Sequence, residues 1–212
     1  MRRLDASHER LEHIVEAVAA VVLNGGIVIF PTDTVYGIGC DPHRLDAVAR
    51  IYDVKNRARN KPLALHLGSR DEALEYVGAN PIAARAARRF LPGPLAIIVE
   101  RPAFIDGMVT AGLESLSLRV PRHALCSAIL DRSGPLAATS ANLSGRPAFI
   151  GGSFDDLPDA DLLIDAGPTP IGIESTVLDF TQQPPLLIRW GAIGRDTLEA
   201  ELGSIRVNAE GP

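Results

Sequence analysis

Apolar residues recur at helical spacing in the first half of the chain, which predicts a series of amphipathic helices. Capping residues mark where these helices begin. The predicted helices are 11–22 with Ser7 as cap, one from Asp41 and Pro42, one from a capping box of Ser69 and Glu72, one from Asn80 and Pro81 to the turn at 92–94, and two near 122–132 and 195–202.

Short apolar runs, typical of buried strands, become more frequent in the second half. The predicted strands are 27–30, 62–67, 95–100, 116–120, 136–139, 161–165, 175–180 and 186–190. Because helices come early and strands dominate late, we expect an α/β (α+β) protein with a twisted, mixed and largely antiparallel open sheet and flanking helices. The pattern shows no domain boundary, so residues 1–212 are expected to form a single domain with a loosely held tail at 203–212.

Composition narrows the function classes. The chain has 21 Lys and Arg against 26 Asp and Glu, a net charge of −5, which argues against general nucleic-acid binding. Cys40 and Cys126 form no CxxC pair, so neither a disulfide framework nor a thiolate metal site is expected. No apolar run approaches the roughly 18 residues that span a membrane. The N-terminus lacks the apolar core of a signal peptide, and we therefore expect a cytoplasmic protein.

A local basic cluster stands out against this acidic background. Lys55, Arg57, Arg59 and Lys61 fall within seven residues, where the second predicted helix ends. Cations are favourable at a helix C-terminus and need no function there, so solvated charges are one interpretation. An anion-binding site is the other. In both cases Lys55 and Arg57 are expected to face solvent.

Three loops next to predicted strands are rich in hydroxyl groups: 31–37, 139–145 and 172–177. Each could be an ordinary polar turn, or could present hydroxyl and backbone N–H groups to a ligand. Arg119 and Arg189 lie within apolar strands, so each needs either a structural carboxylate or an anionic ligand. The chain contains neither a P-loop nor a dinucleotide-binding glycine motif. A nucleotide site would need another architecture.

These segments together resemble a known family. PTDTVYG, KNR with KPL, PGPL, RVP, SAN with SGRP, ESTV and IRWG occur in the order found in the YrdC/TsaC family, over about residues 25–194. Its members are threonylcarbamoyl-AMP synthases. The resemblance implies a YrdC-like fold around a concave basic cavity, and a nucleotidyltransferase that makes L-threonylcarbamoyladenylate and pyrophosphate from L-threonine, bicarbonate and ATP. Partner proteins would then transfer the threonylcarbamoyl group to tRNA as N6-threonylcarbamoyladenosine (t6A37), with a weak tRNA contact as a further expectation.

The resemblance also assigns residues by motif. The positions matching the nucleotide site are Lys55, Arg57, Lys61, Ser115, Ser140, Asn142 and Arg189, of which Lys55 and Arg57 are the expected catalytic cations. The positions matching the threonine site are Thr34, His66, Arg119 and Ser175. Mg²⁺ is expected to be held mainly by ATP phosphates, without a dedicated protein site. Two departures from the family pattern are Ala96, where Thr is common, and Ala148, where Ser is common.

Two alternatives remain. An RNA-binding module could use the same basic cavity, although an aromatic content of 5% offers few stacking surfaces. A carbamoyl-transfer domain related to hydrogenase maturation proteins is the second alternative, although those proteins are much longer and carry CxxC motifs. In contrast to both alternatives, a synthase of the YrdC/TsaC family would cleave ATP to AMP and pyrophosphate without RNA.

Overall fold

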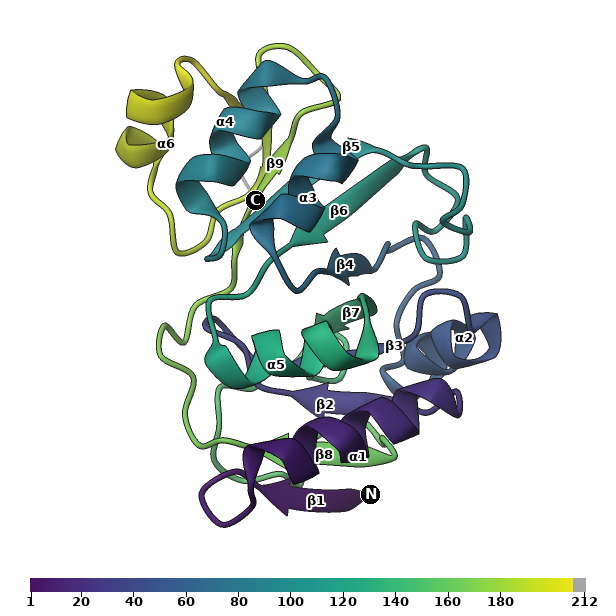
Figure 1. Ribbon diagram of the computed structural model, residues 1–212. Helices are drawn as coiled ribbons and strands as arrows, with labels where there is room; N and C mark the ends of the chain where they lie inside the picture. The colour runs from purple at the N-terminus through teal and green to yellow at the C-terminus, as the bar shows by residue number, and fades with distance from the viewer. Residues whose placement is uncertain (208–212) are drawn as a thin grey trace.

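The computed structural model describes residues 1–207, which form one continuous mixed sheet of 11 strands with helices packed on it (Figure 1). The strand order is β1-β8-β2-β3-β7-β4-β6-β5-β9-β10-β11. The strands are β1 Arg2–Asp5, β2 Val28–Phe30, β3 Gly37–Cys40, β4 Ala64–His66, β5 Leu95–Glu100, β6 Ser115–Arg119, β7 Leu136–Ser140, β8 Leu162–Asp165, β9 Thr176–Asp179, β10 Leu186–Arg189 and β11 Arg206–Val207. The helices are α1 Leu11–Leu23, α2 Leu45–Val54, α3 Arg70–Val77, α4 Pro81–Phe90, α5 Ala124–Ser133 and α6 Arg195–Leu202.

The sheet has two parts that meet where β7 pairs with β4. The first half-sheet contains β1, β8, β2, β3 and β7, and the second contains β4, β6, β5, β9, β10 and β11. Parallel and antiparallel pairs alternate irregularly along the order, and β7 is antiparallel to both of its neighbours, β3 and β4. The mixed, open α/β sheet expected from the sequence is confirmed.

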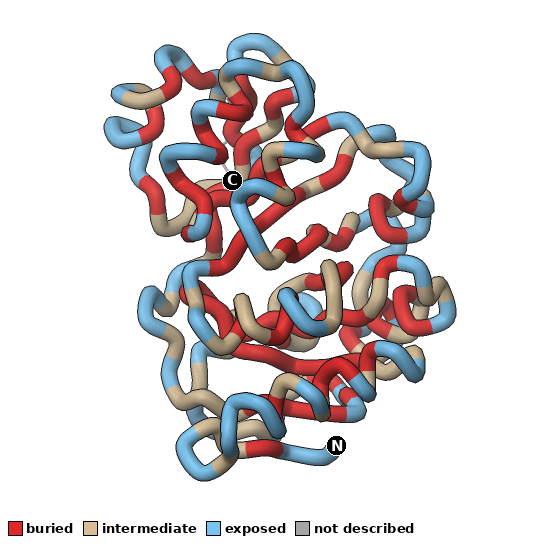
Figure 2. Tube along the Cα trace, in the orientation of Figure 1, coloured by how far each residue is buried: buried red, intermediate tan, exposed pale blue. Residues whose placement is uncertain are grey.

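Helices cover each half separately. Helices α1 and α5 pack side by side over the first half-sheet, whereas α3, α4 and α6 lie over the second (Figure 1). The core consists of two clusters of buried residues, and β2 contributes to both. Val28 and Phe30 pack beneath α1 and α5 in one cluster, whereas Ile29 and the preceding Ile27 belong to the other. Buried segments accordingly concentrate in the strands, and exposed ones in the turns and outer helix faces (Figure 2).

The predicted helix starts are partly correct. Ser69 accepts a hydrogen bond from the Glu72 amide, and Asn80 accepts from the amides of Ile82 and Ala83. Ser7 does not cap α1, because its hydroxyl donates to Asp5 instead. These two N-caps are confirmed and the Ser7 cap is wrong. Helix α2 begins at Leu45, after a turn over 41–44, and not at the predicted Asp-Pro pair.

Strands β1, β3 and β11 were not expected. Glycines occupy two of the four positions of β3. One of them, Gly37, lies so close to Phe30 that an added Cβ would be 2.8 Å from its ring. Strand β11 pairs in parallel with β10, so part of the expected loose tail is hydrogen bonded. The remainder of that tail, 208–212, lies outside the described residues.

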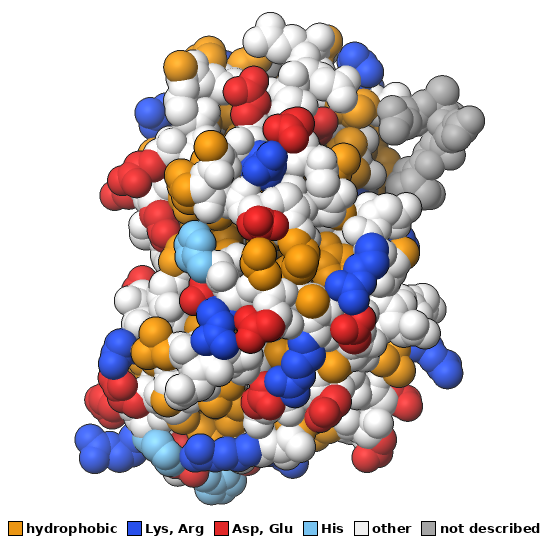
Figure 3. Space-filling view, turned by 90° about the vertical axis from the view of Figure 1, so that its right-hand side faces the viewer, with side chains coloured by type: hydrophobic (Ala, Val, Ile, Leu, Met, Phe, Trp, Pro, Cys, Tyr) orange, Lys and Arg blue, Asp and Glu red, His pale blue; other side chains and the backbone are white. Residues whose placement is uncertain are grey.

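The surface carries charges of both signs. On the face shown in Figure 3, Lys and Arg side chains are interspersed with Asp and Glu, and the outline narrows at mid-height. This face has no continuous basic strip of the kind that follows a nucleic-acid backbone.

Candidate functional site

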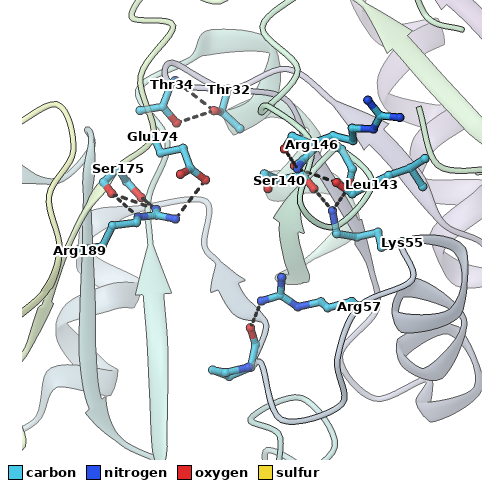
Figure 4. A network of polar contacts seen from close by, with 12 residues as sticks. Thr32, Thr34, Lys55, Arg57, Ser140, Leu143, Arg146, Glu174, Ser175 and Arg189 are labelled. Carbon is cyan, nitrogen blue, oxygen red and sulfur yellow. Dashed lines mark hydrogen bonds and ion pairs between the residues drawn. The ribbon is translucent and has the colours of Figure 1, made fainter. Parts of the chain in front are cut away.

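A cavity of about 360 Å³ lies where the two half-sheets meet. Its walls come from the loop between β2 and β3, from the segment that follows α2, and from strands β3 to β7, β9 and β10. Figure 4 shows side chains from these separate segments facing a common space. Seven of the residues assigned by motif line it: Arg57, Lys61, His66, Arg119, Ser140, Ser175 and Arg189.

Strand pairing explains why distant motifs meet here. Gly37 lies opposite Ser140 in the antiparallel pair of β3 and β7, which joins the 31–37 loop to the 139–145 loop. Strands β4 and β6 run in parallel, so His66 and Arg119 lie next to each other at the same end. Loops and strand ends of this kind commonly carry binding residues.

Lys55 does not face solvent, and that expectation was wrong. Its side chain is only 1% exposed, and its Nζ donates to the backbone oxygens of Ser140 and Asn142. The Ser144 amide donates to the Lys55 carbonyl at 3.0 Å. Burial lowers the pKa of Lys55 to about 8, with the Arg57 charge contributing. Lys55 therefore fastens the 140–144 loop to the end of α2.

Three other assigned residues lie outside the cavity lining. Thr34 is fully buried, and its hydroxyl lies 3.2 Å from that of Thr32. Asn142 donates to the carbonyls of Leu143 and Arg146, and so shapes its own loop. Ser115 begins β6 opposite Glu100, at the other end of that strand from Arg119. The structure thus places two of the three in loops that support the cavity wall, and Ser115 apart from it.

Arg119 has a structural carboxylate partner, one of the two alternatives left open by the sequence. Its Nη2 donates to Oδ1 of Asp33 at 2.6 Å. Its Nε and the other Asp33 oxygen are buried, and neither has a hydrogen-bond partner in the described residues 1–207. One N–H of a buried guanidinium is therefore unsatisfied beside the cavity, where a carboxylate ligand would be favoured.

His66 is a neutral group next to this arginine. Burial, followed by the charge of Arg119, lowers its pKa to about 3, so the imidazole is uncharged at neutral pH. Its Nδ1 is buried and has no hydrogen-bond partner within the part of the chain that the structure describes. Neutral imidazole offers one donor and one acceptor, which suits a hydroxyl or amine better than an anion.

Arg189 forms the opposite wall together with Glu174 and Ser175. Its Nε and Nη2 donate to the Ser175 carbonyl at 3.1 and 2.9 Å, and its Nη1 donates to Glu174 Oε1 at 3.1 Å. The arginine side chain is 38% exposed, so it is less buried than its apolar strand suggested. Figure 4 shows this group across the open space from Ser140 and Lys55.

Arg57 is pre-oriented by the backbone that follows it. Its Nε and Nη2 donate to the carbonyls of Lys61 and Pro62 at 3.2 and 2.9 Å. Burial lowers the pKa of Arg57, although a guanidinium stays charged in proteins. A fixed, partly desolvated cation of this kind can stabilise negative charge without reorganising.

Four further residues belong to the site but were not predicted from the sequence: Thr32, Asp33, Ser117 and Glu174. Thr32, Ser117 and Glu174 line the cavity, whereas Asp33 lies behind it. Both acids stand in the hydroxyl-rich loops 31–37 and 172–177, where cations and hydroxyl groups are the expected partners of an anion. The predicted departure Ala96 also lines the cavity, and Ala148 lines a neighbouring pocket of about 300 Å³.

No group of three or more His, Cys, Asp or Glu side chains in residues 1–207 could hold a metal ion. Within the same residues no helix has the length and apolar character needed to cross a membrane. The two cysteines are buried and unpaired.

Comparison with known proteins shows extensive similarity. The Sua5/YciO/YrdC family model, described as "Telomere recombination", matches residues 20–191. The threonylcarbamoyl-AMP synthase of Bacillus subtilis is 38% identical over 198 residues, covering 90% of this chain and 57% of that protein. The enzyme of the same name from Pyrococcus abyssi is 34% identical over 206 residues, covering 94% and 61%. The chain thus spans about three-fifths of the length of these curated relatives.

Solved structures are similar to this chain as well. P. abyssi Sua5 complexed with L-threonine superposes with a TM-score of 0.87 at 33% identity, covering 98% of this chain and 62% of that one. Escherichia coli YciO, at 22% identity, has a TM-score of 0.78 and 97% coverage of its own chain. A nucleotide-bound HypF shares the fold at 19% identity with a TM-score of 0.69, covering 84% of this chain and 29% of that one.

Proposed function

Because the chain belongs to the Sua5/YciO/YrdC family, we propose that it makes L-threonylcarbamoyladenylate and pyrophosphate from L-threonine, bicarbonate and ATP. One observation carries the proposal: a single cavity collects Arg57, Lys61, Arg119 and Arg189 beside a neutral histidine. Such a wall suits a polyphosphate and an amino-acid carboxylate at the same time. The relative solved with L-threonine supports the choice of amino acid.

We assign the nucleotide to Arg57, Lys61, Ser140 and Arg189, and threonine to His66, Arg119 and Ser175. Arg119 has an unpaired buried Nε for the threonine carboxylate, and neutral His66 lies next to it for the side-chain hydroxyl or the amine. Lys55, Thr34 and Asn142 act through the loops that they hold. Ser115 stays a prediction from the family motif, since it lies outside the lining.

The reaction asks these residues for positioning and charge stabilisation. Threonine's amine attacks bicarbonate-derived CO₂ to give a carbamate, and a carbamate oxygen then attacks the α-phosphorus as pyrophosphate leaves. Negative charge grows on the departing bridging oxygen, where fixed cations such as Arg57 are most effective. Mg²⁺ would neutralise part of the phosphate charge, held chiefly by phosphates and water because the cavity supplies no ligand cluster.

The product would be consumed by proteins that transfer the threonylcarbamoyl group to tRNA, with the reaction placed in the cytoplasm. Exchange of labelled pyrophosphate into ATP tests the proposal. In carbonate-stripped buffer, exchange should require threonine and added bicarbonate together. Exchange with threonine alone would instead indicate an enzyme that adenylates the amino-acid carboxylate.

The same assay addresses the two alternatives. An RNA-binding module would show no exchange, and the mixed charges of Figure 3 do not favour one. A carbamoyl-transfer domain would not require threonine for its reaction. The likeness to HypF, at 19% identity, concerns the fold alone.

A further inference from the structure

Glu174 is a carboxylate on the wall of a cavity whose other charged lining residues are cations. Those cations are Arg57, Lys61, Arg119 and Arg189. Asp33 balances Arg119 from behind, outside the lining. Glu174 is 40% exposed at its side chain, and among residues 1–207 only its Oε1 has a hydrogen-bond partner, Arg189 at 3.1 Å. A carboxylate in this place repels the phosphates of metal-free ATP, so its presence in a polyphosphate site needs an explanation.

Hydrogen bonds hold the backbone around Glu174 in place, so that its side chain stays at the cavity wall. The Glu174 carbonyl accepts from the Ala192 amide at 3.1 Å, and Arg189 holds the next carbonyl through two N–H groups. Gly191 lies so close that a Cβ added to it would be 2.3 Å from the backbone carbonyl oxygen of Glu174. Residues 174–176 are therefore fixed against 189–192, and the carboxylate projects into the space facing Ser140 (Figure 4).

A Mg²⁺ ion bound with the nucleotide would remove the repulsion between the Glu174 carboxylate and the phosphates. Mg²⁺ commonly binds one or two carboxylates together with substrate phosphates, and keeps several of its waters. Residues 1–207 hold no ready metal cluster, so the ion would arrive with the nucleotide. Oε2 of Glu174 has no hydrogen-bond partner among residues 1–207 and would be available to such an ion, as a direct ligand or through one of its waters.

We propose that Glu174 is the residue that makes this site select the magnesium complex of ATP over the metal-free nucleotide. The inference rests on the proposed function, because it requires ATP to occupy the cavity. With the metal present, the carboxylate contacts the cation. Without the metal it faces phosphate oxygens directly, and binding weakens.

Calorimetry with the non-hydrolysable analogue β,γ-imido-ATP measures this selection as a ratio of dissociation constants, Kd in EDTA over Kd in Mg²⁺. The wild-type ratio should be large. Glu174→Gln removes both the repulsion and the metal contact, so the ratio should fall about tenfold. Glu114→Gln is a matched control, since Glu114 also pairs with an arginine at 3.1 Å but stands outside the cavity lining. Its ratio should equal that of the wild type.

Equal ratios for the wild type and Glu174→Gln, within a factor of two, would overturn the inference while leaving the nucleotide site intact. Failure of the wild type to bind the analogue under either condition would overturn the nucleotide site itself, and the inference with it. Thermal melting checks the fold of each variant. If Glu174→Gln does not fold, Glu174→Asp keeps the charge but retracts it by one carbon, and its ratio should be intermediate; an unchanged ratio counts against the inference.

Discussion

Arg119 and Asp33 form an ion pair inside the protein although they are 86 residues apart in sequence. Their side chains are 6% and 4% exposed. Asp33 belongs to the loop between β2 and β3 in the first half-sheet, and Arg119 ends β6 in the second. The pair therefore ties the two halves together beside the cavity, and orients a guanidinium toward it.

Asp33→Ala should strongly destabilise the protein, because Arg119 would be left as a buried charge without its partner. We expect the free energy of unfolding to fall by about 3–5 kcal/mol, measured by urea denaturation. Asp53→Ala is the matched control, since Asp53 pairs with Arg59 at the surface with side chains 67% and 56% exposed. Such a pair contributes about 0–1 kcal/mol. Similar losses in the two variants would contradict the structural role of Asp33.

Lys55→Met should release the loop that follows β7. The carbonyls of Ser140 and Asn142 would lose their buried donor. The free energy of unfolding should fall by about 1–3 kcal/mol for each carbonyl left without a partner. Hydrogen exchange of amides in residues 140–146 should accelerate, and adenylate formation should be lost with it. Lys61→Met, on the exposed side of the same basic cluster, should weaken ATP binding without changing exchange in that loop. Unchanged protection in Lys55→Met would refute the clamp.

His66 predicts a specific acid sensitivity. Its folded-state pKa is lowered from 6.5 to about 3 by burial and Arg119, so the unfolded chain takes up a proton there that the folded protein refuses. Its contribution to unfolding free energy therefore falls as pH drops from 6.5 toward 3, by up to about 3–5 kcal/mol. Urea denaturation at pH 7, 6, 5 and 4 should show a steeper loss for the wild type than for His66→Gln. Parallel curves would show that the ring titrates normally.

Arg57→Ala should remove charge stabilisation in the transition state while preserving the fold. We expect kcat/KM for adenylate formation to fall by roughly 30- to 900-fold, which corresponds to about 2–4 kcal/mol of transition-state stabilisation. Arg59→Ala is the neighbouring control, because that guanidinium contacts Asp53 and the ring of Tyr52 on the outside of the same loop. Near-normal turnover in Arg57→Ala would place the chemistry elsewhere.

Sequence patterns predicted elements that are stabilised locally. The caps at Ser69 and Asn80 involve residues within three positions of each other. Short apolar runs next to turn residues, such as Leu95–Glu100 after the 92–94 turn, favour a buried strand. Strand β3 escaped prediction because its glycines have low strand propensity and are explained by Phe30, a residue on the neighbouring strand. Family motifs gathered most of the cavity residues from unrelated parts of the chain.

The features that the sequence did not predict depend on contacts between residues far apart in the chain. A lysine at a helix C-terminus is usually solvated, and nothing near Lys55 in sequence shows that two carbonyls from another strand would enclose it. Likewise, Arg119 and Arg189 signalled a need for anions, but their partners Asp33 and Glu174 became identifiable only once the strands were arranged.

The placement of the terminal strands at the two outer edges of the sheet makes the molecule convenient for fluorescence labelling. Residue 2 is in β1 at one edge and Ser204 lies just before β11 at the other, with the cavity between them. Burial raises the pKa of Cys40 to about 12 and also raises that of Cys126, so neither thiol competes readily for a maleimide. A donor and an acceptor fluorophore on cysteines introduced at Arg2 and Ser204 would report whether the distance between the two sheet edges changes when substrates enter.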